Sequence, residues 1–541
     1  MSRFENPPLE QIYANKWRIW GVVMIGLFMA LIDITIVNIT IPQLQRDLDA
    51  PVDSVSWVLN AYNIMFAVLL ISMGRLADQF GRKRFFLIGM CIFTVGSLLC
   101  ALSPSIGALF AFRIVQAVGA GILAPIALAM TTLVFPPAQR GLGLGLMAMV
   151  ANFAAALGPP LGGVLVEFAS WPWDSGWHWI FLINVPIGIG GVLLALRVMP
   201  ETRDPHAGTD VDWWGMLTIG GGVFCLTYGL VEANSRGWGS PLILSLFVAS
   251  VLLTVAFALT QRFGRYPMLT SRLVTNRQFM GGSATLLLFA VGMMGTLFMT
   301  VLLFVNLWHY SELEAAFAIS PIALMGLLVS PIVGRLGNRI EPRFLAIPAL
   351  LSMAAGLALL STFPAQPDYP RVLPALILVG AGVGAAFPAV SIGSMGSISG
   401  QELGLGSGIV NMSRQVGFAI GVALLIAVFS ATLDTQISDA RGEVASLTRG
   451  SGLSARQTSA LERRVLVDPQ NPAARPPPRP TTPIERRAER IVSKHVRNAY
   501  AAALRVAALV TLLGFPFALT MRRRPGEVAA PQPAAAAAEG G

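Results

Sequence analysis

The chain has 541 residues, of which 54% are hydrophobic and only 12% are charged, whereas soluble proteins are about a quarter charged. This composition excludes an ordinary soluble domain and predicts an integral membrane protein, because the excess apolar surface must face lipid. The net charge of +10 is spread over short connections between apolar runs, so nucleic-acid binding is not expected. The first residues do not resemble a cleavable signal peptide, so the first apolar run is expected to be a span.

The apolar runs predict fourteen transmembrane helices, since about 20 residues of helix cross a bilayer. An even number places both termini on one side. The short loops richest in Lys and Arg belong on the cytoplasmic side, and they include residues 75–84 and 335–343, which places the termini inside. The predicted spans are 18–40, 54–73, 84–102, 106–134, 141–168, 177–199, 213–233, 241–261, 279–308, 315–334, 344–363, 371–398, 405–432 and 498–521.

Three pairs of similar segments indicate an internal duplication, because all are separated by about 260 residues. The pairs are 74–84 with 334–343, 118–125 with 379–388, and 141–153 with 402–414. Two six-helix halves with two helices inserted between them would give this offset, and repeated halves around a central site are the architecture of rocking transporters.

The predicted organisation is all-α, and its boundaries follow the spans. The segment 433–496 combines a Pro-rich stretch with polar flanks that could be helical, so it is predicted to be an extracytoplasmic hairpin or partly disordered loop. The parts are a cytoplasmic N-terminus (1–17), an N-terminal six-helix bundle (18–200), two linking helices (201–265), a C-terminal six-helix bundle (277–521) interrupted by the loop 433–496, and a disordered cytoplasmic tail (522–541).

Asp33 is a carboxylate deep inside the first apolar run. An ionised Asp at the centre of a span costs about 2.5–3.5 kcal/mol on insertion scales, so it should line a cavity, be paired or hold a proton. Arg113 lies at a similar depth in its own span, which permits pairing. A moving arginine could time proton release from Asp33. The alternatives are a structural hydrogen bond at Asp33 and a static ion pair with Arg113.

Five motifs occur in order along the chain. They read LIDITIVN (31–38), GRLADQFGRKR (74–84), RIVQAVGAG (113–121), GPPLGG (158–163) and WHWIFLINVPIG (177–188). Together they resemble the signatures of the major facilitator superfamily, in its fourteen-span drug:H+ antiporter branch (the EmrB/QacA type). Ala117 replaces a glycine that is usual in the third motif.

The resemblance implies roles for several of these residues. Asp33 and Arg113 would couple transport to protons. Gly74, Asp78, Gly81 and Arg82 would form a gating loop, in which Asp78 faces the positive end of a helix in the other half and Arg82 supports it. The second copy has Asn338 where an acid is usual, so a weaker or absent latch is expected there. The antiporter motif is Gly158, Pro159, Gly162 and Gly163, for which a simple helix bend is the alternative.

Polar side chains in the other spans are candidates for a substrate cavity. Arg414 is expected to be structural, while Glu312 and Glu314 at the outer end of a span could contribute to coupling. The cavity candidates are Asn38, Tyr62, Asn63, Gln116, Asn152, Asn306 and Asn411.

These observations predict a proton-driven multidrug efflux antiporter, not an enzyme, that exports lipophilic or cationic compounds by alternating access. An exporter of an endogenous lipid, siderophore or metabolite is the alternative. The Gly-Pro motif argues against an uptake symporter, and the four histidines and three cysteines show no arrangement for a metal site or intramembrane catalysis. No cofactor is expected. The expected partners are protons, a small-molecule substrate and the lipid bilayer. We expect a monomeric transport unit in a bacterial inner membrane, with a periplasmic adaptor protein as a candidate partner.

Overall fold

The computed structural model describes the chain except residues 1–5, 169–175, 205–209, 400–401, 450–481 and 523–541, and except the side chains of 38, 39, 42, 52, 53, 168, 312, 313 and 449. The described residues form helices, and fourteen of these helices are long and apolar enough to cross a membrane. The number agrees with the prediction. The predicted disordered tail lies almost entirely outside the described residues.

The first half of the chain forms one bundle of helices. α6 is its central helix and the most buried of the candidate spans, which suits its small and apolar residues. The helices of this half are α1 (Leu9–Ala14), α2 (Lys16–Ile36), η1 (Val37–Thr40), α3 (Ile41–Asp47), α4 (Val52–Phe80), α5 (Arg82–Ala101), α6 (Ile106–Val134), η2 (Pro137–Gln139), α7 (Arg140–Phe168), α8 (Trp177–Leu182) and α9 (Asn184–Val198).

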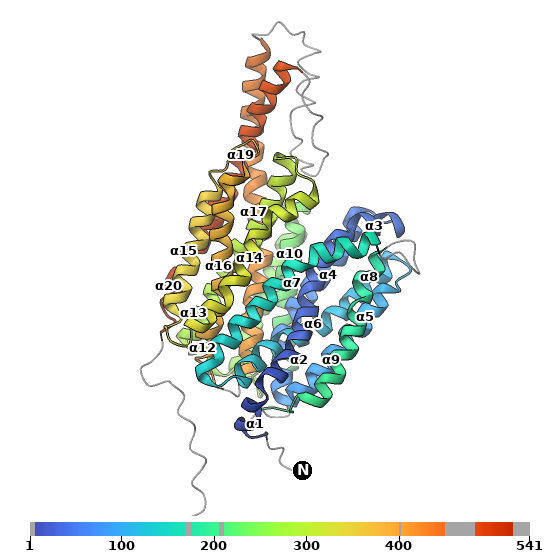
Figure 1. The fold of residues 1–541 in the computed structure, drawn as a ribbon, viewed down its shortest axis with the longest axis vertical. Helices are drawn as coiled ribbons and strands as arrows, with labels where there is room; N and C mark the ends of the chain where they lie inside the picture. Colours follow the sequence, from blue (N-terminus) through green and yellow to red (C-terminus); the bar gives the residue numbers. More distant parts are fainter. Residues whose placement is uncertain (1–5, 169–175, 205–209, 400–401, 450–481, 523–541) are drawn as a thin grey trace, which may run out of the picture.

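The second half forms a similar bundle beside the first (Figure 1). Its most buried candidate span is α16, whose place in the second half corresponds to that of α6 in the first. The helices of this half are α12 (Ser271–Thr275), α13 (Arg277–Leu302), η3 (Leu303–Leu307), α14 (Glu312–Leu336), α15 (Arg343–Leu360), α16 (Tyr369–Met395), α17 (Leu403–Arg449), α19 (Pro483–Leu512) and α20 (Phe515–Ala518).

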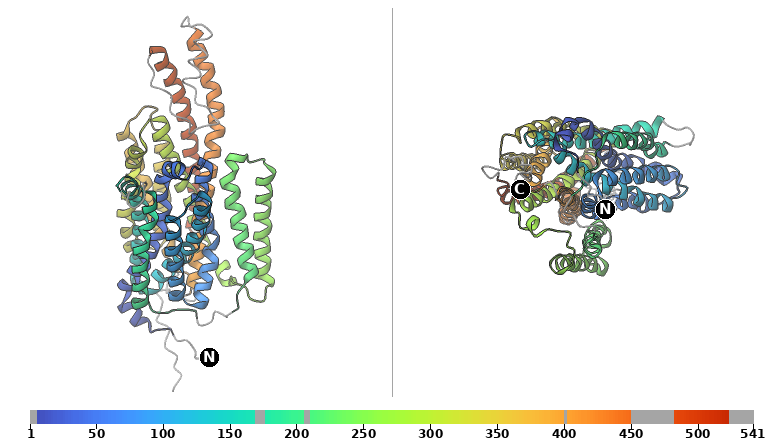
Figure 2. Two further views of the ribbon diagram at one scale, coloured as in Figure 1. Left: turned by 90° about the vertical axis from the view of Figure 1, so that its right-hand side faces the viewer. Right: turned by 90° about the horizontal axis from the view of Figure 1, so that it is seen from below.

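Two linking helices, α10 (Trp213–Arg236) and α11 (Pro241–Phe263), stand beside the two bundles (Figure 2). α10 contacts α4 and α17, and its Tyr228 ring packs 5.2 Å from that of Trp57. α11 is the least buried of the candidate spans. Its exposed Val, Leu and Phe side chains are those expected of a surface that faces lipid.

The segment 433–496 was predicted to be a hairpin with flanks that could be helical, or a partly disordered loop. α17 continues as a helix to Arg449, and α19 begins at Pro483, so both flanks of the loop are helical and only its centre lies outside the described residues. The two helices project together from one end of the molecule (Figure 1). They pair because apolar residues recur along both, and these become buried: Ile437, Ala440 and Val444 on α17, and Ala488, Val492 and Val496 on α19.

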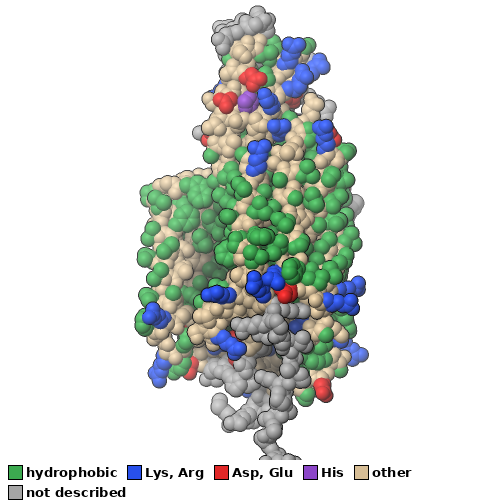
Figure 3. All heavy atoms as spheres, turned by 90° about the vertical axis from the view of Figure 1, so that its left-hand side faces the viewer, with side chains coloured by type: hydrophobic (Ala, Val, Ile, Leu, Met, Phe, Trp, Pro, Cys, Tyr) green, Lys and Arg blue, Asp and Glu red, His purple; other side chains and the backbone are tan. Residues whose placement is uncertain are grey.

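We call the end of the molecule that carries this projection the hairpin face, and the end that carries residues 6–16 the N-terminal face. Hydrophobic side chains cover the middle of the surface between the two, and Lys and Arg side chains gather toward both ends (Figure 3). This distribution is that of a protein encircled by lipid, with its charges at the two polar interfaces.

The two halves meet closely near the N-terminal face. α4 packs on α17, and α7 packs on α14. Glycines allow the backbones to touch: a methyl group added to Gly74 would collide with the carbonyl of Gly404, and one added to Gly145 would lie 2.7 Å from the Cα atom of Gly334. The structure is therefore closed at this face.

Candidate functional site

Asp33 and Arg113 form an ion pair inside the first half. Arg113 Nη1 donates a hydrogen bond to Asp33 Oδ2, and neither side chain is more than 1% exposed. Asp33 comes from α2 and Arg113 from α6, so the pair joins two spans. The pairing that their similar depth permits is present.

A polar network extends this pair to two further helices. Gln116, one turn after Arg113, donates to Asp33 Oδ1 (3.0 Å) and accepts a hydrogen bond from Arg113 (2.8 Å). It also donates to Ser97 Oγ on α5 (3.1 Å), which Asn184 of α9 approaches at the same distance. Every carboxylate oxygen of Asp33 thus has a donor, which a buried charge requires.

Aromatic rings close the network from both sides. The guanidinium carbon of Arg113 lies 4.2 Å from the ring centre of Tyr62 and 5.6 Å from that of Phe181. The Tyr62 hydroxyl donates to the carbonyl of Ala30, 2.9 Å away. Tyr62 and Gln116 were predicted to line a cavity; both are instead fully buried around the ion pair, because Arg113 turns inward and needs their ring face and amide.

The antiporter motif lies against the helix that carries Asp33. A methyl group on Gly158 would collide with the Thr35 side chain, so this glycine sets the distance between α7 and α2. Gly162 is buried, whereas a methyl group on Gly163 would meet no atom within 4 Å. α7 continues as a helix through Pro159 and Pro160.

Asp78 connects the two halves at the N-terminal face. Its Oδ1 and Oδ2 atoms accept hydrogen bonds from the backbone N–H groups of Gly404 and Leu405, both 3.0 Å long, at the start of α17. Arg82 donates to Asp78 Oδ1 through Nη2 (2.7 Å) and Nε (3.1 Å). A carboxylate at a helix N-terminus is stabilised by unpaired N–H groups and the helix dipole. We call this contact between the halves the latch.

The symmetric position has a latch as well. Asn338 Oδ1 accepts a hydrogen bond from the N–H of Gly141, 2.9 Å away, at the start of α7. The prediction of a weaker or absent latch needs a correction in one respect, since this contact is present. It is one neutral hydrogen bond in place of two to a carboxylate, because an amide has a single acceptor oxygen.

Glu201 holds the gating loop from within the first half. Its carboxylate accepts hydrogen bonds from the backbone N–H groups of Lys83 (3.0 Å) and Arg84 (3.1 Å) and so caps the start of α5. Burial raises the pKa of the Glu201 carboxyl, and these backbone hydrogen bonds oppose the rise. Gly81, with a φ of 114°, passes so close to Glu201 that a side chain there would meet both backbone strain and the carboxylate.

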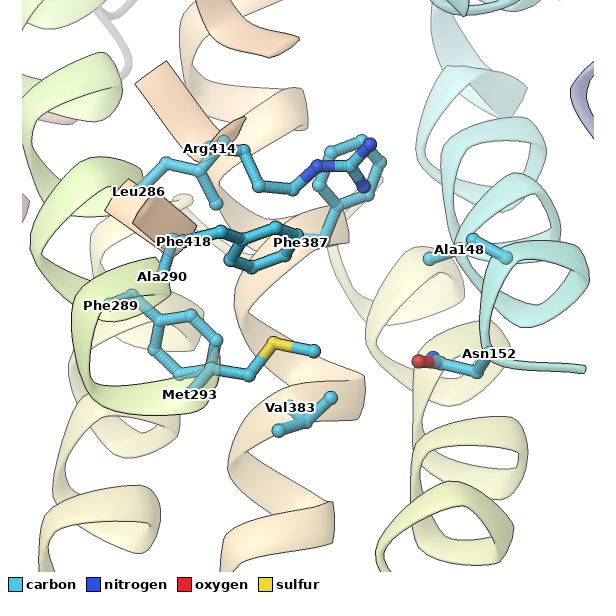
Figure 4. A pocket seen from close by; sticks show the side chains of 11 residues that line it. Ala148, Asn152, Leu286, Phe289, Ala290, Met293, Val383, Phe387, Arg414 and Phe418 are labelled. Carbon is cyan, nitrogen blue, oxygen red and sulfur yellow. The ribbon is translucent and has the colours of Figure 1, made fainter. Parts of the chain in front are cut away.

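A central pocket lies between the halves. Met293, Phe387, Phe418 and Arg414 line it from the second half, and Asn152 lines it from α7 (Figure 4). Asn152 also donates to Ser330 Oγ of α14 (3.1 Å), so it takes part in the contact between halves. Of the seven predicted cavity residues, Asn152 is the one that lines this pocket in the described conformation.

The remaining candidates lie elsewhere. Asn411 is buried beside the pocket, where its Oδ1 accepts a hydrogen bond from Arg414 (3.3 Å). Asn306 bonds to Tyr500 of α19, and Asn63 is exposed. Glu314 caps its own helix by accepting hydrogen bonds from Ser311. The side chains of Asn38 and Glu312 are outside the described part.

Sequence reasoning missed three polar residues. Ser97 and Asn184 belong to the network around Asp33, and Arg414, expected to be structural, points into the pocket. The available signal was the same as for Asp33, a polar residue within an apolar run. Small polar residues are frequent in membrane helices, so this signal alone does not identify which of them belong to a functional site.

Comparison with known families and proteins gives a consistent result. A sequence profile described as the Major Facilitator Superfamily matches residues 23–422. The chain is 36% identical over 435 residues to a puromycin resistance protein (pur8) of Streptomyces alboniger, covering 79% of this chain and 84% of that one. It is 27% identical to a tetracenomycin C resistance and export protein of Streptomyces glaucescens, over 98% of this chain and 96% of that one. It is also 30% identical to a multidrug resistance protein (Stp) of Mycobacterium tuberculosis, with 76% of each chain covered.

Solved structures show the same fold. A human organic anion transporter, MFSD10, aligns with a TM-score of 0.58 over 93% of this chain and 99% of its own. The proton:xylose symporter XylE aligns with a TM-score of 0.57, over 92% and 95%. Identities of 14% and 13% make these likenesses of fold alone.

Proposed function

Because the chain belongs to the major facilitator superfamily, we propose that this transporter exports lipophilic compounds in exchange for protons. It is a multi-pass membrane transporter and not an enzyme. Relatives whose names refer to antibiotic resistance and export favour efflux as the direction of transport.

One observation carries the proton coupling: Asp33 is a fully buried carboxylate whose bound partners are Arg113 and Gln116. Protonation of Asp33 would remove its charge and its attraction for Arg113. The guanidinium would then be free to turn toward other acceptors, and the tie between α2 and α6 would weaken. A proton that changes the relative stability of two conformations can drive an exchange between them.

The latch distinguishes the two conformations. With Asp78 bound to the start of α17, the N-terminal face is closed. We place this face in the cytoplasm and both termini with it, in a bacterial inner membrane, as the positive loops favour. Substrate would enter when the latch opens and would leave through the hairpin face.

The pocket supports lipophilic substrates, since Phe289, Phe387, Phe418 and Met293 line it. No carboxylate that could bind lipophilic cations, the other predicted class, lies among the lining residues.

The proposal includes a monomeric transport unit. In a host with two membranes, a periplasmic adaptor protein would contact the paired helices α17 and α19. Failure of the two proteins to co-purify would count against this partner.

The test is dye transport in everted membrane vesicles energised with a proton gradient. Wild type is expected to move a neutral lipophilic dye, and Asp33→Asn is expected to move none at equal amounts of folded protein. The matched control is Asp368→Asn, which removes an exposed acid at the start of α16. Normal coupled transport by Asp33→Asn would refute the coupling role. A wild type that moves no dye of a broad panel would favour the exporter of an endogenous product.

A further inference from the structure

Arg414 brings a positive charge into the middle of the membrane. It lies eleven residues into α17, about 16 Å from the start of that helix at 1.5 Å per residue. Its side chain extends over the Phe387 ring into the pocket that separates α17 from α7 (Figure 4). The guanidinium carbon is 4.9 Å from the centre of that ring and 6.0 Å from that of Phe418.

The charge of Arg414 is not balanced within the described part of the chain. Arg414 forms no ion pair with a described carboxylate; one Nη2 hydrogen bond reaches the Asn411 amide, and the buried Nε has no acceptor. The buried acids Asp33 and Asp78 are each paired with another arginine, Asp33 with Arg113 and Asp78 with Arg82. An arginine has five N–H donors, so most of its hydrogen-bonding capacity remains unused.

A guanidinium with an unpaired, buried Nε in a membrane span is unfavourable, and ring faces compensate only part of the loss. An oxyanion supplies what is missing, because it matches the fork of N–H donors with two charge-assisted hydrogen bonds. The other lining residues are apolar except Asn152, and they include Phe289, Phe418 and Met293. They suit an apolar or aromatic body attached to that oxyanion.

We propose that this pocket binds lipophilic compounds that carry an acidic oxygen group, with Arg414 holding the anionic oxygen. This inference rests on the proposed function, whose substrate it specifies. It replaces the cationic class expected from the sequence with an anionic one.

The pocket must enlarge to do this. Its volume is about 50 Å³ in the closed conformation, whereas sites for drug-sized ligands have about 300–1,000 Å³. Asn152 lies on one half and Arg414 on the other, so separation of the halves widens the space between them. The ligand would then be admitted when the N-terminal latch is open.

The experiment compares three probes that share one body and differ in charge: 4-(1-pyrenyl)butyrate, 4-(1-pyrenyl)butylammonium and 4-(1-pyrenyl)butanol. Binding to the protein in lipid nanodiscs is followed by transfer of tryptophan excitation to pyrene, with empty nanodiscs as the partition background. No proton gradient is applied, so the result does not depend on coupling. We expect the butyrate to bind at least about 10-fold more tightly than the ammonium, as charge-assisted hydrogen bonds of about 1.5–3 kcal/mol imply.

Variants assign the preference to one side chain. Arg414→Gln is expected to weaken butyrate binding about 10-fold or more and to leave the butanol unchanged, while Arg414→Lys keeps part of the preference because it keeps the charge. Arg371→Gln, which removes an exposed arginine at the start of α16, is the control and is expected to bind as wild type does. Should Arg414→Gln fail to fold, Phe418→Leu tests the same pocket and should weaken all three probes alike.

Three results would overturn the inference. They are equal or tighter binding of the ammonium, butyrate binding that survives Arg414→Gln, and no butyrate binding by wild type. A wild type that transports dye but does not distinguish charge would refute this inference alone, whereas charge-selective binding without proton-driven transport would refute only the coupling.

Discussion

The side-chain oxygen of Asn338 accepts a hydrogen bond from the backbone N–H of Gly141, 2.9 Å away in the other half of the molecule. Asp78 makes the corresponding contacts to Gly404 and Leu405, with a charge added and with Arg82 behind it. The N-terminal face is therefore held by two latches of the same geometry and of different strength.

The first prediction concerns these latches. Asp78→Asn is expected to shift the population toward conformations open at the N-terminal face by about 10-fold or more, because hydrogen bonds to a charged group contribute about 1.5–3 kcal/mol. Asn338→Ala should shift it less, because a neutral hydrogen bond contributes about 0.5–1.5 kcal/mol. The measurement is the distance distribution between spin labels at the exposed Arg84 and Arg339, by double electron–electron resonance. The native Cys91, Cys100 and Cys225 must first be replaced.

Equal opening by the two substitutions would contradict the role given to the charge. No opening by either would show that the packing of the glycines at Gly74 and Gly145 closes this face without help from the latches.

A second prediction concerns the buried ion pair. Arg113→Gln leaves the Asp33 carboxylate without its cation, and Asp33→Asn leaves the guanidinium without its anion. Each is expected to cost about 3 kcal/mol or more, since removal of one partner strands a buried charge. The double substitution removes both charges and should cost less than the sum. Thermal unfolding of the three proteins in one detergent gives the comparison, and additive losses would mean that the two groups do not interact.

The antiporter motif provides a matched pair of glycines. Gly158→Ala should destabilise the protein by about 1–3 kcal/mol, because the added methyl group collides with Thr35 and forces α7 away from α2. Gly163→Ala, five residues later in the same helix, has open space around it and should be nearly neutral. Unfolding temperatures and dye transport are measured for both. If the two variants behave alike, close packing against α2 does not explain why a glycine occupies position 158.

Glu201 predicts a pH dependence of stability. Burial holds its folded-state pKa above its ordinary value of 4.5, so protonation favours the folded state. Its contribution to stability is complete below the unfolded pKa and is lost as the pH rises through the folded pKa. Glu201→Gln does not titrate, so the unfolding temperature of wild type relative to this variant should fall as the pH rises from 4.5. A constant difference, or one that grows with pH, would contradict the raised pKa.

The latch and the ion pair show how far sequence reasoning reaches. The resemblance to the family implied that Asp78 would face the start of a helix in the other half. The positions of Asp33 and Arg113 within their spans placed them at one depth. Spacing did not show that Tyr62 and Gln116 surround the ion pair in this conformation, since it gives the face of a helix but not which neighbour covers that face. The same limit concealed Ser97, Asn184 and the pocket around Arg414.

The sequence by itself determined that the chain crosses a membrane, how many times it does so, and that its halves are related, because apolar length, charge bias and repeat offset are properties of order along the chain. Tertiary structure decided which polar groups meet. Asp33 and Arg113 are 80 residues apart, and Asp78 and Gly404 are 326 apart. Contacts at such separations depend on how helices pack in three dimensions. That packing also left Arg414 facing a pocket without a carboxylate, which no pattern along one helix could show.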